Sequence, residues 1–244
     1  MIVRRIGGVA LLLGISLTGM RAQVAGVRGR IEIEGGAQPK HGSSPGTVVW
    51  LTPVPGTMHG PGPEAPAPAS GLKLTQRNKS FEPHLLVVPA GSVVEFPNRD
   101  PFFHNVFSLF EGKRFDLGLY EAGSSRMVHF DRPGISYIFC NIHPEMSAVV
   151  ITLATPYYAV ANGEGQLNIP NVSYGRYIVH VWSEGMGPEN SQPEGHEITI
   201  GEGSTALGVI RVPAASKQSL AHKNKYGRDY DTATPDNPAY HQHP

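Results

Sequence analysis

The chain has 244 residues, and its 20 Lys and Arg residues balance 20 Asp and Glu residues, so the formal net charge at pH 7 is zero. That balance excludes the strongly basic surface that binds nucleic acid or anionic membranes, and we expect neither partner. Charged residues make up only 16% of the chain, whereas glycine and proline are abundant at 29 and 22 residues. This composition is typical of short strands joined by turns, and it predicts an all-β fold.

Residues 1–22 have the form of a secretory signal peptide. Arg4 and Arg5 give a basic start, an apolar run extends from Ile6 to Leu17, and Ala22 is a plausible cleavage point. The run is too short to cross a bilayer. We therefore expect export to the periplasm or the medium, with no membrane span after cleavage.

Two strands are expected first, at 27–33, where apolar and polar residues alternate, and at 47–52. Residues 54–71 are rich in proline, glycine and alanine, which predicts an exposed linker. Met58 and His59 lie in this linker and are expected to be solvated loop residues.

Strand patterns then recur at short spacing between residues 72 and 153, as in a Greek-key β-sandwich of one small domain. The expected strands are 85–88, 93–96, 104–109, 126–130, 136–140 and 148–153.

The motif C-N-I-H-P-E-M contains Cys140, the single cysteine of the chain, with His143 and Met146 at spacings of three residues. An unpaired cysteine in an exported protein needs a reason, and metal ligation is one. The alternative is a buried apolar cysteine. Thiolate, imidazole and thioether together suit copper in a His₂Cys site with a weak axial Met. The second histidine must come from elsewhere, and His104 in F-F-H-N-V is the best candidate.

Residues 72–153 resemble the cupredoxins, particularly amicyanin and pseudoazurin. The motifs that carry the resemblance are V-V-P-A-G-S-V-V-E-F-P-N-R-D, F-F-H-N-V, F-D-L-G, Y-I-F-C and C-N-I-H-P-E-M. The resemblance implies one copper ion held by His104, Cys140, His143 and Met146. It also implies that Asn105 braces the metal loop by hydrogen bonding.

Groups around the ligands should tune the copper potential. Asn105 and the backbone around Asn141 are candidates for hydrogen bonds to the sulfur. An apolar docking patch would surround His143 and receive a transient protein redox partner. Its expected members are Phe102, Phe103, Ile142 and Pro144, and Phe139 is expected either to shield the sulfur or to pack in the core.

Beyond residue 155 the chain resembles the second half of a transthyretin-like, carboxypeptidase-regulatory-type β-sandwich. The motifs are G-Q-L-N-I-P-N-V and G-R-Y-I-V-H-V-W, with further strands expected at 196–200 and 207–212. Residues 27–53 have the form of the first half. We therefore predict a smaller, discontinuous second sandwich of residues 27–53 and 155–213, with the cupredoxin sandwich inserted between its second and third strands. The alternative assigns 27–53 to the cupredoxin.

The tail, residues 214–244, is polar and lacks apolar periodicity, so we expect it to be disordered, with His241 and His243 near a frayed end.

The function expected from these features is that of an exported type 1 copper protein that carries single electrons between redox partners. Alternatives are copper storage, delivery or sensing, and a structural module without metal. We expect no enzyme, because Cys140 and His143 lack the oriented third group of a nucleophilic site. His84, His129 and His180 are expected to be ordinary strand histidines.

Overall fold

The structure is a computed structural model that describes residues 23–34, 46–60, 62–109, 112–186, 195–214 and 222–230. Over these ranges the fold is all-β, and the helical content is one 3-10 turn, η1 (Glu184–Met186). Within the same ranges, no helix combines the length and the apolar character needed for a membrane crossing. The expected signal peptide, His241 and His243 lie outside the described residues.

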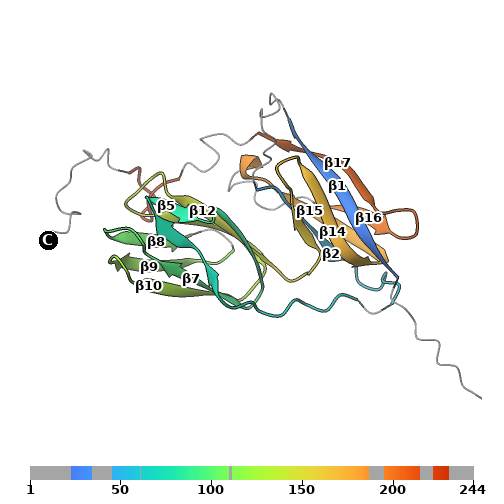
Figure 1. The fold of residues 1–244 in the computed structure, drawn as a ribbon, viewed down its shortest axis with the longest axis horizontal. Helices are drawn as coiled ribbons and strands as arrows, with labels where there is room; N and C mark the ends of the chain where they lie inside the picture. Colours follow the sequence, from blue (N-terminus) through green and yellow to red (C-terminus); the bar gives the residue numbers. More distant parts are fainter. Residues whose placement is uncertain are drawn as a thin grey trace, which may run out of the picture.

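The first sandwich is formed by the strands between residues 72 and 153, green in Figure 1. One sheet has the order β10-β7-β3, the second has the order β6-β12-β11-β8-β9, and β4 pairs with β5. The strands are β3 (Leu72–Lys73), β4 (Thr75–Arg77), β5 (Ser80–Glu82), β6 (Leu85–Pro89), β7 (Ser92–Pro97), β8 (His104–Ser108), β9 (Phe115–Tyr120), β10 (Ser125–Phe130), β11 (Gly134–Cys140) and β12 (Ser147–Leu153).

Each strand expected in this region is present, with ends shifted by no more than two residues. The short strands β3, β4 and β5 were not predicted, and neither was the longer β9. Its residues do not alternate cleanly between buried and exposed positions, and Gly118 within it has a φ of 68°. The pairing of β9 with β8 also shifts register between Asn105 and Phe107. An irregular edge strand of this kind leaves no period-of-two signal in the sequence.

The second sandwich consists of a sheet with the order β14-β1-β17 and a sheet with the order β13-β2-β15-β16. Strand β1 pairs with β14 and β17, and β2 pairs with β13 and β15, so the strands before residue 54 join strands that follow residue 155. This pairing supports the prediction of a discontinuous sandwich. The strands are β1 (Val24–Glu34), β2 (Val48–Pro53), β13 (Tyr158–Val160), β14 (Gln166–Ser173), β15 (Gly175–Trp182), β16 (His196–Ile200) and β17 (Ala206–Pro213).

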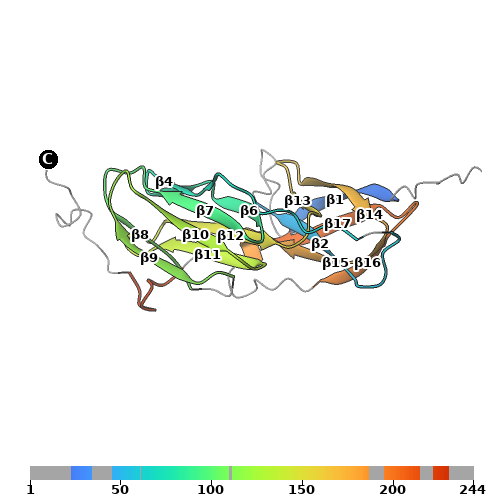
Figure 2. The same ribbon diagram turned by 90° about the horizontal axis from the view of Figure 1, so that it is seen from below.

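The two sandwiches lie side by side (Figures 1 and 2) and share a buried apolar contact. Along β11, Ile138 and Cys140 face the core of the first sandwich, whereas Tyr137 and Phe139 face the second one. There they pack in one cluster with Trp182 of β15, whose Nε1 donates a hydrogen bond of 3.0 Å to the Tyr137 hydroxyl. The five-stranded sheet is thus covered on both faces, which explains why β11 is an almost continuous apolar run.

In the expected linker, the described residues 54–60 and 62–71 form no strand and are mostly exposed. Met58 departs from the expectation of a solvated side chain, because it is half-buried against the core of the second sandwich. The reason is local: the amide of His59 donates to the carbonyl of Tyr174 at 2.9 Å and holds this stretch against the sandwich. The His59 side chain itself is exposed.

Residues 222–230 of the expected disordered tail are folded into a turn against the first sandwich. The turn is closed by Asn224, whose amide donates to the carbonyl of Arg228 at 2.9 Å and whose Oδ1 accepts from the Arg228 amide at 3.1 Å. Asparagine stabilises turns through such side-chain bonds, which require no apolar periodicity. The remainder of the tail, residues 215–221 and 231–244, lies outside the described residues.

Candidate metal centre

Three donor atoms converge at one end of the first sandwich. His104 is the first residue of β8, Cys140 is the last residue of β11, and His143 lies in the loop that follows. The Cys140 Sγ atom lies 3.6 Å from His104 Nδ1 and 3.5 Å from His143 Nδ1, and the two Nδ1 atoms are 3.2 Å apart. Cys140 pairs with Val106, close to His104, across the β11–β8 ladder, and this pairing brings residues 36 positions apart together.

Met146 closes the same loop through its backbone. Its amide donates to the carbonyl of His143 at 3.1 Å, and its carbonyl accepts from the amide of Cys140 at 3.2 Å. The Met146 side chain is fully buried and belongs to the same apolar cluster as Cys140. A thioether is therefore buried in the same apolar core as the thiol, on the loop that also carries His143.

The spacing of the three donors fits a metal ion. Nitrogen and sulfur ligands at about 2.0–2.3 Å from an ion in tetrahedral or trigonal geometry lie about 3.3–3.8 Å from one another. The two sulfur–nitrogen separations, 3.5 and 3.6 Å, lie within this range, and the separation of the two nitrogens, 3.2 Å, lies just below it. One thiol, two imidazoles and a nearby thioether form a soft donor set that suits copper better than hard cations.

Burial keeps both histidines neutral near pH 7. Desolvation, together with the neighbouring His104, lowers the pKa of His143 to about 4. Desolvation also lowers the pKa of His104, although its hydrogen bond to Asp100 acts in the opposite direction. Neutral imidazoles carry the lone pair that a metal needs, so neither ring has to lose a proton when a metal binds.

The Cys140 thiol, unlike the two imidazoles, carries a proton that it must lose when a metal binds. Burial raises the pKa of Cys140, and hydrogen bonds from the backbone amides of Ile142, Asn105 and His143 offset only part of that rise. Without a cation the sulfur is therefore protonated, and metal binding must release this proton. The amides already point toward the sulfur and would stabilise a thiolate.

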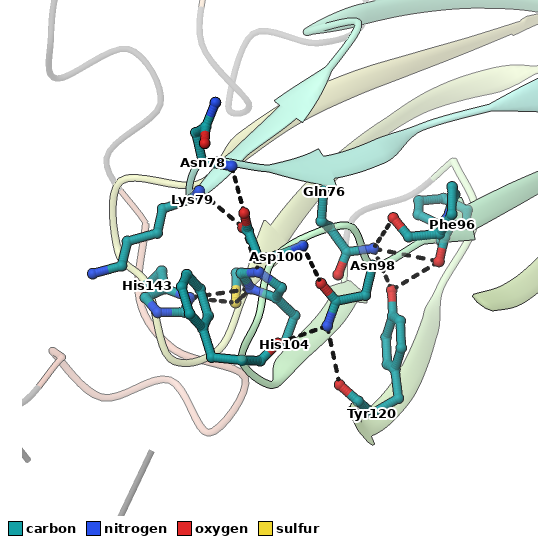
Figure 3. A network of polar contacts seen from close by, with 12 residues as sticks. Gln76, Asn78, Lys79, Phe96, Asn98, Asp100, His104, Tyr120 and His143 are labelled. Carbon is teal, nitrogen blue, oxygen red and sulfur yellow. Dashed lines mark hydrogen bonds and ion pairs between the residues drawn. The ribbon is translucent and has the colours of Figure 1, made fainter. Parts of the chain in front are cut away.

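Asp100 is the main site residue that the sequence analysis missed. Its Oδ2 lies 2.9 Å from His104 Nε2, the ring nitrogen that does not face the cluster (Figure 3). Both side chains are buried. Since Nε2 donates to the carboxylate, Nδ1 is left as the lone-pair nitrogen that faces Cys140 and His143. The sequence signal was an Asp four residues before the histidine, a spacing too common to be selective by itself.

Asp100 is held by amides of an adjoining turn. Asn78 and Lys79 donate their amides to its two carboxylate oxygens at 2.6 and 3.0 Å. Burial by itself would raise the pKa of Asp100, but these amides and His104 outweigh it, and the pKa is lowered. The carboxylate is thus charged and oriented. Asn98 fixes the same loop, because its Oδ1 accepts from the Asp100 amide at 3.0 Å (Figure 3).

Replacing Asp100 with alanine should weaken copper binding by about 10- to 100-fold, the usual cost of removing a carboxylate that orients a ligating histidine. A competition titration against a chelator of known affinity would measure the loss. Asp100→Asn retains an oxygen acceptor and should recover part of the affinity. Asp131, whose carboxylate pairs with Lys113 at the surface, provides the control Asp131→Asn. An alanine variant that binds as tightly as the wild type would contradict this role.

Asn105 and Asn141 both make hydrogen bonds that brace the loop. The carbonyl of Asn105, not its side chain, accepts the amide of Asn141 at 2.9 Å. The Asn105 side chain instead donates to Asp116 Oδ1 at 2.7 Å and to the carbonyl of Gly118 at 2.9 Å, both in β9. Asn141 Oδ1 accepts the amide of Lys225 at 2.9 Å. The resemblance of residues 72–153 to the cupredoxins gave no sign of the bond to residue 225.

The expected docking residues lie around the cluster. Phe102 is half-buried, with its ring centroid 5.3 Å from that of His104 and 5.5 Å from that of His143. Phe103 and Ile142 are half-buried as well, and Pro144 is exposed. His143 is the more exposed of the two histidines.

Phe139 does not shield the sulfur, because it faces the second sandwich, opposite to the Cys140 side chain. The three histidines expected on other strands also make contacts away from the cluster; His129 and His180 lie on β10 and β15 as expected, whereas His84 lies in the bend between β5 and β6. His84 contacts the Ser147 carbonyl and Glu184, His129 contacts the Gly91 carbonyl, and His180 stacks on Trp50.

No family model matches the chain, and the search of curated proteins finds no match. Among solved structures, the chain is similar to a Cu-containing nitrite reductase from Thermus scotoductus SA-01, with 25% identity, 36% of this chain and 23% of that chain covered, and a TM-score of 0.33. It thus spans less than a quarter of that enzyme.

The chain is also similar to a purple cupredoxin from Nitrosopumilus maritimus, with 21% identity, 34% and 99% coverage of the two chains and a TM-score of 0.31. A third similar structure is a mutant of amicyanin in its reduced Cu(I) form, with 18% identity, 43% and 98% coverage and a TM-score of 0.33. At these TM-scores, nothing of their chemistry is carried over to this chain. These structural neighbours are cupredoxins, the family that residues 72–153 resemble in sequence.

Proposed function

We propose that this protein is an exported type 1 copper protein that carries single electrons between redox partners in the periplasm. The observation that carries the proposal is the convergence of one thiol and two imidazole Nδ1 atoms to within 3.2–3.6 Å, beside a buried methionine. His104, Cys140 and His143 would be the strong ligands, and Met146 would be a weak one.

Bound copper would supply a one-electron couple between Cu(I) and Cu(II). The residues of the chain would limit rearrangement during that change. His104 is held by Asp100, and the loop with Cys140 and His143 is closed by its own hydrogen bonds. Cys140 and Met146 are fully buried, which keeps water from the sulfur donors. Thiolate and thioether favour Cu(I), whereas imidazole accepts both states.

Electron exchange would take place at the half-buried edge of the site. The Phe102 ring lies against His143 there, and Ile142 and Pro144 flank His143 in the chain. With Phe103, they would form a small apolar contact of the kind that suits a transient redox partner. We propose a carrier without catalytic residues, because copper oxidases and nitrite reductases need additional histidine clusters. The described residues hold one cluster of His, Cys, Asp or Glu donors that could bind a metal. The absence of enzymatic activity stays a prediction, as do export and the division into two domains.

Reconstitution with Cu(II) tests the proposal. The protein should take up one copper ion, develop an intense visible absorption from thiolate-to-copper charge transfer, and show a reversible couple in a redox titration. A site that binds Cu(I) tightly but does not cycle would favour copper storage, delivery or sensing. A protein that takes up no copper would leave the cupredoxin fold as a structural module and refute the proposal.

A further inference from the structure

The C-terminal segment 222–230 lies against the loop that carries three of the four candidate ligands, Cys140, His143 and Met146, although it is distant from them in the sequence. The Tyr230 hydroxyl donates to the carbonyl oxygen of Cys140 at 2.8 Å. The Lys225 amide donates to Asn141 Oδ1 at 2.9 Å. Two consecutive residues of the metal loop, Cys140 and Asn141, are therefore bound by the same distant segment.

A closed ring of hydrogen bonds links this segment to the strand of the first histidine. The Lys225 ammonium pairs with Asp116 Oδ2 at 2.7 Å, and Asp116 Oδ1 accepts from Asn105 Nδ2 at 2.7 Å. The carbonyl of Asn105 accepts a hydrogen bond from the amide of Asn141 at 2.9 Å. Asn141 Oδ1 accepts from the amide of Lys225, which closes the ring. Asn105 directly follows His104. The ring thus connects β8, β9, the metal loop and the C-terminal segment.

Aromatic contacts fix the segment to the outer face of the five-stranded sheet. The His222 ring stacks on Phe139, with centroids 3.7 Å apart and an angle of 26° between the planes. His222 Nδ1 lies 3.1 Å from the Tyr230 hydroxyl, so the two ends of the segment also contact each other. Phe139 is the residue before Cys140, on the opposite face of β11. The stack therefore holds the segment against the end of the strand from which the thiol projects.

We propose that Tyr230 and Lys225 are positioning residues of the copper site: through their bonds to Cys140 and Asn141, residues 222–230 clamp the metal loop in its ligating conformation. The expected change in the EPR spectrum rests on the proposed copper function, whereas the expected order of the metal-free loop does not. The clamp orders the loop before metal arrives and restricts the sulfur while metal is bound. Ligand geometry held within a fraction of an ångström requires such supporting bonds.

Amide hydrogen exchange in the full-length, metal-free protein tests the clamp independently of copper. Tyr230→Phe removes the hydroxyl alone, and Lys225→Met removes the ion pair but keeps the backbone bond. A net hydrogen bond contributes about 0.5–1.5 kcal/mol, so exchange at the amides of Cys140, Asn141 and Met146 should accelerate about 2- to 10-fold in Tyr230→Phe. The double variant should show a larger effect. If amide exchange in Tyr230→Phe and in the double variant equals that of the wild type, the proposal is overturned.

Tyr226→Phe is the matched control. Tyr226 lies in the same turn and is 71% exposed, and its ring centroid lies 5.3 Å from the Lys225 ammonium. Phenylalanine keeps that ring contact, so this variant should leave exchange in the loop unchanged. The Cu(II) forms are then compared by EPR. Tyr230→Phe should broaden the copper signal, because the sulfur samples a wider range of positions, whereas Tyr226→Phe should not.

The possible results separate the clamp from the copper function. Accelerated exchange together with an unaltered copper spectrum would reduce the segment to a structural support and overturn its positioning role. A wild-type protein that takes up no copper would refute the proposed function, and that result is independent of the exchange measurement on the metal-free chain.

Discussion

Replacing Cys140 with serine should abolish the visible absorption of the copper-loaded protein completely. The hydroxyl nearly preserves the shape of the side chain at this fully buried position, but serine stays a neutral alcohol at neutral pH. It offers copper no thiolate, and a charge-transfer band from sulfur to copper then has no donor. Losing a residue that only supports a ligand costs about 10- to 100-fold in copper affinity, and losing the ligand itself should cost more. We expect a loss of at least about 100-fold. Optical titration with Cu(II) measures both effects.

The control for this substitution is His129→Ala. His129 is an exposed histidine of β10 whose Nε2 contacts the Gly91 carbonyl, away from the cluster. Its removal should leave absorption and affinity unchanged. Because Cys140 is the single cysteine of the chain, no other thiol can replace it. Colour that persists in Cys140→Ser would refute the ligand assignment.

Trp182→Ala should destabilise the protein by about 3–5 kcal/mol, the usual cost of truncating a buried large aromatic residue to alanine. Trp182 is 1% exposed and packs in the cluster between the two sandwiches. The substitution removes the indole from this contact and also removes the donor to the Tyr137 hydroxyl. Chemical denaturation followed by circular dichroism measures the free energy of unfolding.

Tyr137→Phe separates packing from hydrogen bonding in the same contact. It keeps the ring but removes the acceptor of the Trp182 indole, which should cost about 1–3 kcal/mol because a buried donor loses its partner. The alanine variant should therefore be the less stable of the two. A loss below about 1 kcal/mol in Trp182→Ala would contradict a stabilising contact between the sandwiches.

The strands were predictable where one or both faces are buried in a regular way. β7 and β10 alternate, β11 and β12 are apolar runs, and each was recognised within two residues of its ends. Strand β9 was not recognised, because Gly118 and an irregular pairing break its alternation. The alternation of apolar and polar residues indicates which side chains are buried only where successive side chains point to opposite faces of the sheet.

The spacing of Cys140, His143 and Met146 is enough to place three donors in one loop, because residues so close in sequence must be close in space. His104 was chosen as the best candidate for the second histidine, and the family resemblance implied the same residue; strand pairing brings its Nδ1 to within 3.6 Å of the Cys140 sulfur. The support of the site was not predictable. Whether a carboxylate such as Asp100 reaches a histidine depends on side-chain direction, which spacing does not encode.

The sequence by itself determined the all-β class, most strand positions and the donor types, since each depends on residue chemistry and short-range periodicity. Only the tertiary structure decided that Asp100 holds His104, that Trp182 joins the two sandwiches and that residues 222–230 cover the metal loop. Each of these contacts depends on a few directional hydrogen bonds or on one buried ring. It joins residues that are far apart in the sequence, and no local pattern specifies the order of the strands that bring them together.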